Sequence, residues 1–331
     1  MVASLGRIVS SRHFWPLLVF VLTLLLLRHL STDFFSISDG RVYGSLVDVF
    51  VRGSQVMLLA LGMTLVIATG GIDLSVGAVM AISGAMSAWL LTAHEASAGV
   101  AIAGGLGVGA VCGLWNGALV AWFGLQPIIA TLILMTAGRG IAQLITDGTI
   151  ITFHHAAFEA LGKGYALGVP ISVWLVLGML LVIGAVVDWT NLRLSIESIG
   201  SNATASRVAG VPVARVRLLV YVVSGLCAGL AGLINAANIA AADANNAGLY
   251  LELDAILAVV IGGAALSGGR FSLTGALVGA LVVQGLTTTI LTSDVSVHAT
   301  RVVKAVVVVL VCLLQSPAFR ARLQRMIRRR P

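Results

Sequence analysis

Charged residues are scarce in this sequence. Asp, Glu, Lys and Arg together make up 10% of its 331 residues, whereas hydrophobic residues make up 59% and the mean hydropathy is +1.05. A soluble globular domain carries roughly 25% charged residues. The composition therefore excludes an ordinary soluble protein and predicts a protein that lies in a membrane.

Lysine is rarer still, because the chain contains only Lys163 and Lys304. A phosphate-binding P-loop needs a lysine followed by Ser or Thr. Here Lys163 is followed by Gly164 and Lys304 by Ala305. The chain therefore cannot itself be a P-loop ATPase, and any ATP-driven activity must depend on another polypeptide.

Cysteine and histidine give no sign of a reactive centre. The three cysteines, Cys112, Cys227 and Cys312, are far apart in predicted helices and suggest neither a disulfide framework nor a metal site. None of the six histidines stands four residues from another. We therefore predict a protein that is not an enzyme, with no catalytic residue, no metal site and no bound cofactor.

Long charge-free runs define the predicted fold. A membrane-spanning helix needs about 20 mostly apolar residues, and the breaks between such segments predict an all-α, polytopic inner-membrane protein with one transmembrane domain over residues 1–331. We expect about ten spanning helices, within a range of eight to ten, some of them broken. They are predicted near 14–27, 48–68, 75–93, 99–123, 128–146, 169–188, 216–238, 252–267, 273–291 and 301–316.

Basic residues set the predicted orientation. With both termini inside, thirteen Arg side chains fall on the cytoplasmic side, whereas six Arg or Lys side chains fall outside. Cytoplasmic loops usually carry the excess of positive charge. This asymmetry places a loop at about 190–215 and a basic tail at 317–331 in the cytoplasm. We interpret the tail as a topology signal or a contact with anionic lipid, not as a nucleic-acid site.

The stretch Asn191–Val211 is a polar island between two long apolar runs. It carries Arg193, Glu197 and Arg207, and a membrane protein gains nothing from placing these charges in lipid. The island must therefore lie in water or contact another protein. From the pattern alone, a short helix that docks on a partner and an ordinary solvated loop are equally good interpretations.

A short repeat occurs in both halves of the chain. GGIDLSVG at 70–77 and GGAALSGG at 262–269 share Gly-Gly-x-x-Leu-Ser-x-Gly. Gly-interrupted hydrophobic segments at matching positions of a transporter often mark its substrate route. The alternative is that both are tight turns near the inner face.

Glycines also recur every fourth residue within predicted helices. Gly105, Gly109, Gly113 and Gly117 form one such row, and the pairs Gly225–Gly229 and Gly275–Gly279 form two more. Small residues at this spacing allow close packing of helices in lipid. We assign these glycines to structure.

Polar side chains in apolar surroundings are the candidates for function, because they are costly there. We predict that a central substrate pathway is lined by Asp73, Asn116, Asn235 and Asn238. Its outer mouth, or a nearby docking surface for a partner protein, is predicted to be formed by Asp243, Asn245, Asn246, Glu252 and Asp254. The alternatives without a role in transport are an ordinary outer loop for residues 235–246 and a hydrogen bond between helices for Asn116. Arg139 is expected to snorkel or to pair with a carboxylate.

Several of these sequences together resemble one family, the permeases of ribose-type ABC sugar importers. The resemblance rests on GMTLVIATGGIDLSVGAVMA, GLWNGALVA, QPIIATLILMTAGRG, the segment 197–211 and LELDAILAVVIGGAALSGGRFSLTGALVGAL. Within the family, LILMTAGRGIAQLIT (132–146) and ADANNAGLYLELDAILAVVIGG (242–263) are most similar to galactofuranose permeases. Ala264 is a departure, because ribose permeases carry Thr after the second Gly-Gly.

The resemblance implies a type II-importer-like permease fold with a cytoplasmic coupling helix. The residues expected to couple to the ATPase are Glu197, Gly200, Asn202, Ala205, Ala209 and Gly210. The implied partners are ABC ATPase subunits that bind ATP and Mg, a second permease subunit (a different paralogue or a second copy), a periplasmic sugar-binding protein, a monosaccharide and the bacterial inner membrane.

The function that the resemblance implies is import of a monosaccharide, with galactofuranose expected. The alternatives are a permease for ribose, galactose, xylose or an autoinducer-type sugar, or a proton-coupled secondary transporter. The last class would use embedded carboxylates such as Asp73 and Asp254 as proton relays and would not need the polar island.

Overall fold

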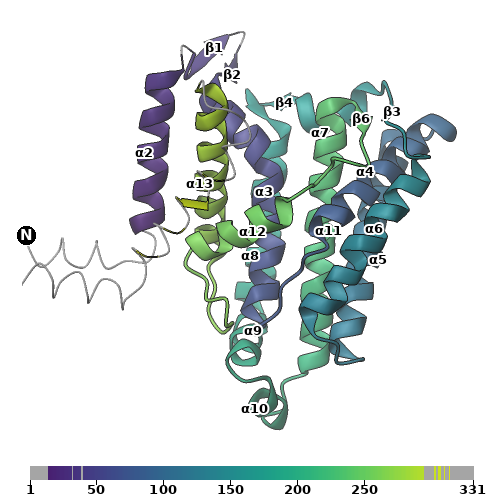
Figure 1. The fold of residues 1–331 in the computed structure, drawn as a ribbon, viewed down its shortest axis with the longest axis vertical. Coiled ribbons are helices and arrows are strands. Elements are labelled where there is room, and N and C mark those ends of the chain that lie inside the picture. Colours follow the sequence, from purple (N-terminus) through teal and green to yellow (C-terminus); the bar gives the residue numbers. More distant parts are fainter. Residues whose placement is uncertain are drawn as a thin grey trace, which may run out of the picture.

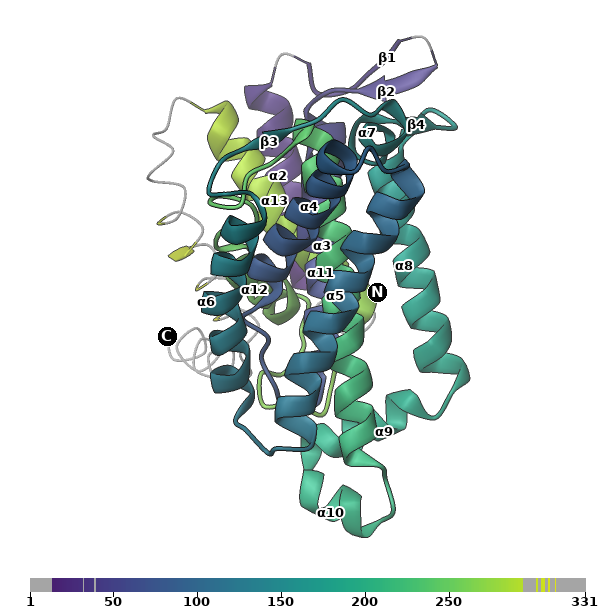
Figure 2. The same ribbon diagram turned by 90° about the vertical axis from the view of Figure 1, so that its right-hand side faces the viewer.

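The protein is a bundle of long helices with short strands and helices at its two ends (Figures 1 and 2). The computed structural model describes residues 14–31, 33–38 and 40–293, together with 302, 305, 306, 309 and 313. The helices in chain order are α2 (Phe14–Leu30), α3 (Ser45–Ala68), α4 (Val76–Ala93), α5 (Ala98–Ala121), α6 (Pro127–Ile145), α7 (Ala156–Lys163), α8 (Ile171–Trp189), α9 (Leu192–Ser201), α10 (Ala203–Val208), α11 (Val213–Ile239), α12 (Leu251–Ile261) and α13 (Leu273–Thr292).

Six short strands pair into three antiparallel sheets within the described part of the chain. β1 (Ser36–Ser38) pairs with β2 (Arg41–Tyr43), β3 (Ile151–Thr152) with β6 (Ala241–Ala242), and β4 (Tyr165–Ala166) with β5 (Val169–Pro170). The labelled strands lie at one end of the bundle, and α9 and α10 lie at the opposite end (Figure 2). The bundle therefore has two distinct ends.

Seven of the described helices are long and apolar enough to cross a membrane, namely α3, α4, α5, α6, α8, α11 and α13. The predicted spans at these places are confirmed to within a few residues. α2 is also apolar but, at 17 residues, is shorter than these seven helices. The predicted helix at 301–316 lies mostly outside the described residues.

One predicted span was wrong in length. The helix expected at 252–267 is α12, which ends at Ile261. At 1.5 Å per residue, its 11 residues cannot cross a hydrocarbon core of about 30 Å. The helix stops because Gly262 approaches the backbone of α13 and Gly263 takes a left-handed conformation with φ +87°.

Burial separates a central group of helices from a peripheral group. α3 is buried almost continuously from Val56 to Ala68, and large parts of α4 and α11 are also buried. α5, α6 and α8 bury much less and expose large apolar side chains, including Val111, Leu132 and Leu181. A helix that is apolar all round suits either a protein interior or lipid, which is why the sequence pattern does not distinguish the two groups.

Glycines bring the central and peripheral helices together, as the sequence predicted. Gly225 of α11 faces Gly109 and Gly113 of α5, and a side chain on Gly225 would lie 2.9 Å from the Gly113 backbone. A similar contact joins α13 to α12, where Gly279 lies against Ala258. The packing role of these glycines is confirmed.

The two ends of the bundle are expected to face opposite sides of the membrane. Val208 on α10 is 87% exposed, and Leu167 between β4 and β5 is 91% exposed. In a variant lacking Cys312, a cysteine at position 208 should react with an impermeant maleimide only in inside-out vesicles. A cysteine at position 167 should react only in spheroplasts. The reverse pattern would overturn the orientation given by the basic residues.

Candidate functional site

A polar groove opens between α3, α11 and α13. Its volume is about 490 Å³, and it lies toward the end that carries the strands, because it includes the first turn of α3 and the last turn of α11. Its polar lining consists of Asp48, Arg52, Gln55, Asn235, Asn238, Gln284 and Thr287. A smaller adjoining pocket of about 170 Å³ shares Asp48 and Asn238 and adds Lys163 and Tyr165.

Helical spacing explains how these side chains meet. Asp48, Arg52 and Gln55 are four and three residues apart on α3, so they share one face of that helix. Gly53 lets α13 approach closely, since a side chain on Gly53 would lie 3.2 Å from Cγ of Gln284. Gln284 in turn donates from Nε2 to Thr288 Oγ1 at 3.3 Å.

The chemistry of the groove suits a neutral, hydroxyl-rich ligand. A carboxamide both donates and accepts hydrogen bonds. Four of the seven polar side chains that line the groove are amides, namely Gln55, Asn235, Asn238 and Gln284. Asp48 and Arg52 add one charge of each sign. The groove thus offers paired donors and acceptors without a net charge.

Sequence reasoning found part of this lining and missed the rest. Asn235 and Asn238, which the sequence placed in the substrate pathway, line the groove, and their role in transport stays a prediction. The missed residues are Asp48, Arg52, Gln55, Gln284 and Thr287. The available signal was the spacing of the three polar residues of α3, all of which fall within the helix predicted at 48–68.

Asp73 and Asn116 lie elsewhere, in a buried hydrogen-bond network. Asp73 accepts from the backbone N of Ser75 at 3.0 Å, from Ser75 Oγ at 2.6 Å and from Ser224 Oγ at 2.9 Å. Asn116 Nδ2 donates to Ser75 Oγ at 2.8 Å. Neither residue is among those that line the groove. These contacts tie the chain after α3 to α5 and α11, and a role in the pathway stays a prediction.

The loop before α12 is held by α6. Arg139 donates from one guanidinium nitrogen to the carbonyls of Ala244 at 2.9 Å and Ala247 at 2.7 Å. Gln143 Nε2 donates to Asn245 Oδ1 at 2.7 Å. Arg139 therefore donates hydrogen bonds to backbone carbonyls. The sequence had predicted that its side chain would snorkel or would pair with a carboxylate. Non-helical backbone needs such partners at membrane depth.

The acidic residues of this region have separate local roles. Partial burial works against the charge of Asp243, but bonds from Asn246 and Asn245 lower the pKa of its carboxyl below the ordinary value. Glu252 and Asp254 lie in the first turn of α12, where negative charge is favoured by the helix dipole. The residues predicted to form the outer mouth thus lie in the loop before α12 and in the first turn of α12, beside α6.

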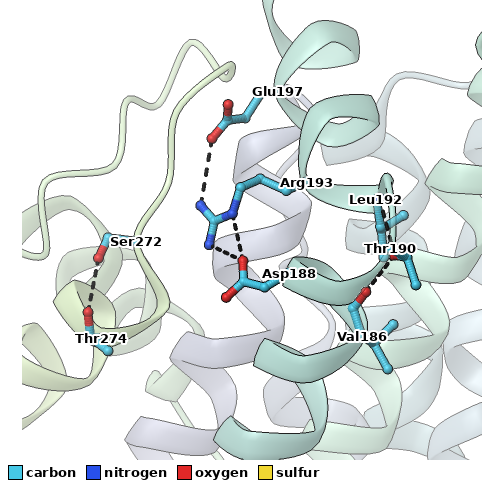
Figure 3. A network of polar contacts seen from close by, with 8 residues as sticks. All are labelled: Val186, Asp188, Thr190, Leu192, Arg193, Glu197, Ser272 and Thr274. Atoms are coloured by element: carbon cyan, nitrogen blue, oxygen red, sulfur yellow. Dashed lines mark hydrogen bonds and ion pairs between the residues drawn. The ribbon is translucent and has the colours of Figure 1, made fainter.

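The polar island forms two short helices, α9 and α10. Arg193 Nε donates to Asp188 Oδ1 at 2.8 Å, and another guanidinium nitrogen lies 3.8 Å from Glu197 Oε1 (Figure 3). The guanidinium also lies over the ring of Phe271, 4.9 Å from its centroid. α9 is therefore fixed to the end of α8 and to the loop that precedes α13.

The six expected coupling residues divide into two groups. Glu197 and Gly200 are half-buried against the bundle, whereas Asn202 caps α10 by accepting from the backbone N of Ala205 at 2.9 Å. Asn202, Ala205, Ala209 and Gly210 are exposed. The exposed group is the part of the island that a partner can reach.

Comparison with known proteins identifies the family. Residues 45–312 match a family described as "Branched-chain amino acid transport system / permease component". The chain belongs to this permease family. It is accordingly a non-catalytic, multi-pass membrane component of a transport system, as the sequence predicted.

Its relatives are permeases for sugars. It is 50% identical to the galactofuranose transporter permease protein YtfT of Escherichia coli, over 92% of this chain and 90% of the relative. It is 38% identical to the fructose import permease FruF of Bifidobacterium longum, over 94% and 89%. It is 36% identical to the ribose import permease RbsC of E. coli, over 91% and 92%. No solved structure matches significantly.

Proposed function

We propose that this chain is the membrane-spanning subunit of an ATP-driven monosaccharide importer, with galactofuranose as the favoured sugar. The observation that carries the proposal is the 50% identity to a galactofuranose permease over 92% of the chain. The polar groove provides the physical counterpart, because its amides and its balanced charges match a neutral ligand with many hydroxyl groups.

The groove is the outer part of the proposed sugar route. A permease must release its cargo, so each contact should be weak, and a typical hydrogen bond contributes only about 0.5–1.5 kcal/mol. Seven polar side chains distributed over three helices fit this requirement. We assign Asn235 and Asn238 to this route, and the segment 243–254 borders the groove through Leu251.

ATP hydrolysis drives transport in this proposal, and it must take place on a separate ATPase subunit because this sequence has no P-loop. The ATPase subunit would dock on the end that carries α9 and α10, where Ala205, Ala209 and Gly210 are exposed beside Val208. ATP and Mg belong to that subunit, and this chain binds no cofactor. In this arrangement α9 and α10 are the coupling helices of a type II-importer-like fold.

The remaining partners follow from the same proposal. A periplasmic sugar-binding protein delivers the monosaccharide at the end that carries the strands. A second permease subunit, a paralogue or a second copy, completes the route in the bacterial inner membrane. About ten helices, with both termini in the cytoplasm, agree with the thirteen-to-six distribution of basic residues.

The rival function is proton-coupled transport through Asp73 and Asp254. Cellular uptake separates the two. Bacteria that naturally carry this chain should lose uptake of labelled galactofuranose when its gene is deleted and regain it on re-expression. Uptake should survive a protonophore while ATP is maintained. Loss of uptake under the protonophore would favour proton-coupled transport. If re-expression restored uptake of ribose or fructose but not of galactofuranose, the proposed substrate would be wrong.

The groove predicts which side chains slow transport. Asn235→Leu and Gln284→Leu should each lower the uptake rate about two- to tenfold, the effect of one weakened hydrogen bond. Neither should lower the amount of this chain in the membrane or the basal ATP hydrolysis of the partner ATPase. Gln126→Leu is the matched control, because Gln126 is exposed at the start of α6 and its side chain makes no capping bond. If both groove variants took up the sugar as fast as the Gln126 control, the groove would be excluded as the sugar route.

A further inference from the structure

The segment that joins α3 to α4 contacts α9 at one end. We call residues 68–77 the link segment. Gly200 of α9 lies so close to it that a side chain on Gly200 would overlap the Ala68 carbonyl oxygen. The same side chain would overlap the backbone N of Gly269, which itself donates to the Ala68 carbonyl at 3.0 Å. Backbone therefore meets backbone, with no side chain between to absorb a movement.

Both copies of the internal repeat meet at this point. A side chain on Gly268 would lie 3.0 Å from the Gly200 backbone and 3.0 Å from the Gly70 N. Gly70 belongs to the first repeat, and Gly268 and Gly269 belong to the second. A cavity of about 410 Å³ adjoins this junction and is lined by Ser201, Gly263, Ala265 and residues 267–270. At this junction α9 thus packs tightly against both repeats, and a cavity lies beside the second repeat.

The middle of the link segment is held firmly in the bundle. Asp73 accepts from Ser224 of α11 at 2.9 Å, and Ser75 accepts from Asn116 of α5 at 2.8 Å. These four side chains are nearly or fully buried, with at most 2% of their surface exposed. In a region of low dielectric such bonds are costly to break, so the segment should move as one piece with its partners.

The other end of the link segment reaches the border of the groove. Gly77 packs against Gly248 so closely that a side chain on either would overlap the backbone of the other. A side chain on Gly77 would also lie 2.7 Å from Oε2 of Glu252. Gly248 and Glu252 flank Leu251, which lines the groove. The link segment therefore joins α9 to the groove through consecutive contacts.

We propose that the link segment transmits movement of α9 to the loop 243–250 and so to the groove, and that Gly200 is the positioning residue that makes this possible. The inference rests on the proposed function, because it requires an ATPase that moves α9. The first repeat acts in it as a mechanical element, and the second repeat as the neighbour that can shift into the adjoining cavity.

Hydrogen exchange in the wild-type complex tests the inference without a variant. The complex of this chain with its copurified ATPase is compared with and without a non-hydrolysable ATP analogue. Amide exchange should change together in α9, in 68–77 and in 243–250, and not in the hairpin 165–170. A response in α9 without one in 243–250 would overturn the inference. Failure of any ATPase to copurify would instead refute the proposed function.

Variants provide the second test. Gly200→Ala and Gly77→Ala should each lower ATP-dependent uptake about tenfold, within the range for mutations along a coupling route, while ATPase binding and basal hydrolysis persist. Gly178→Ala on α8 is the control, because nothing lies within 4 Å of a side chain there. Wild-type uptake by both link variants would contradict the inference. If they fail to accumulate, the exchange experiment decides it.

Discussion

Replacing Gly225 with leucine is expected to remove most of the folded protein from the membrane. The position faces the backbone of Gly109 and Gly113, and even one added carbon would lie 2.9 Å from the Gly113 backbone. Overpacking a core typically costs about 1–3 kcal/mol, and here the obstacle is backbone that cannot rotate away. α5 and α11 would have to separate along much of their contact.

The amount of monodisperse protein extracted in mild detergent measures this effect. Gly178→Leu is the matched control, because Gly178 is exposed on α8 with no neighbour within 4 Å. The control should be extracted at the wild-type level. Normal extraction of the Gly225 variant would show that α5 and α11 do not pack as described.

The second large effect is expected at Arg139. Its replacement by leucine leaves the carbonyls of Ala244 and Ala247 without their charged donor. A buried polar group that loses its partner costs about 1–3 kcal/mol, so the loop before α12 should detach from α6. We expect a clear fall in the thermal midpoint in detergent and loss of most sugar uptake.

Two further variants make the Arg139 result specific. Arg139→Lys keeps a positively charged donor and should retain part of both stability and uptake. Gln143→Leu removes one exposed bond to Asn245 and should change either measurement little. If Arg139→Leu behaves like the Gln143 variant, the two carbonyl bonds do not hold the loop.

Composition and charge-free runs were sufficient to predict most helices, because long apolar segments have few alternatives in lipid. They failed at α12, where the apolar run continues past Ile261 but the backbone turns at Gly262, which packs on α13, and at Gly263, which has a positive φ. Hydropathy measures the side chains and does not register such a contact. The same limit applies to α3 and α5, which have the same mean hydropathy of 1.7 but differ in burial.

The candidate site was harder to predict than the fold. Asn235 and Asn238 stood out because amides are conspicuous in an apolar helix, and the structure places both in the groove. Asp73 and Asn116 stood out for the same reason, but they lie in a separate buried network. A polar residue in the membrane needs a partner or a cavity, and only the tertiary arrangement shows which of the two it has.

Transport into proteoliposomes tests the central claim most directly. The vesicles would contain this chain with its copurified permease and ATPase partners, oriented so that the end carrying α9 and α10 faces the lumen. ATP would be enclosed in the lumen, and labelled galactofuranose and its binding protein would be added outside. The account predicts accumulation of the sugar that requires ATP and continues when the proton gradient is abolished. Accumulation without ATP, driven by a proton gradient, would contradict it.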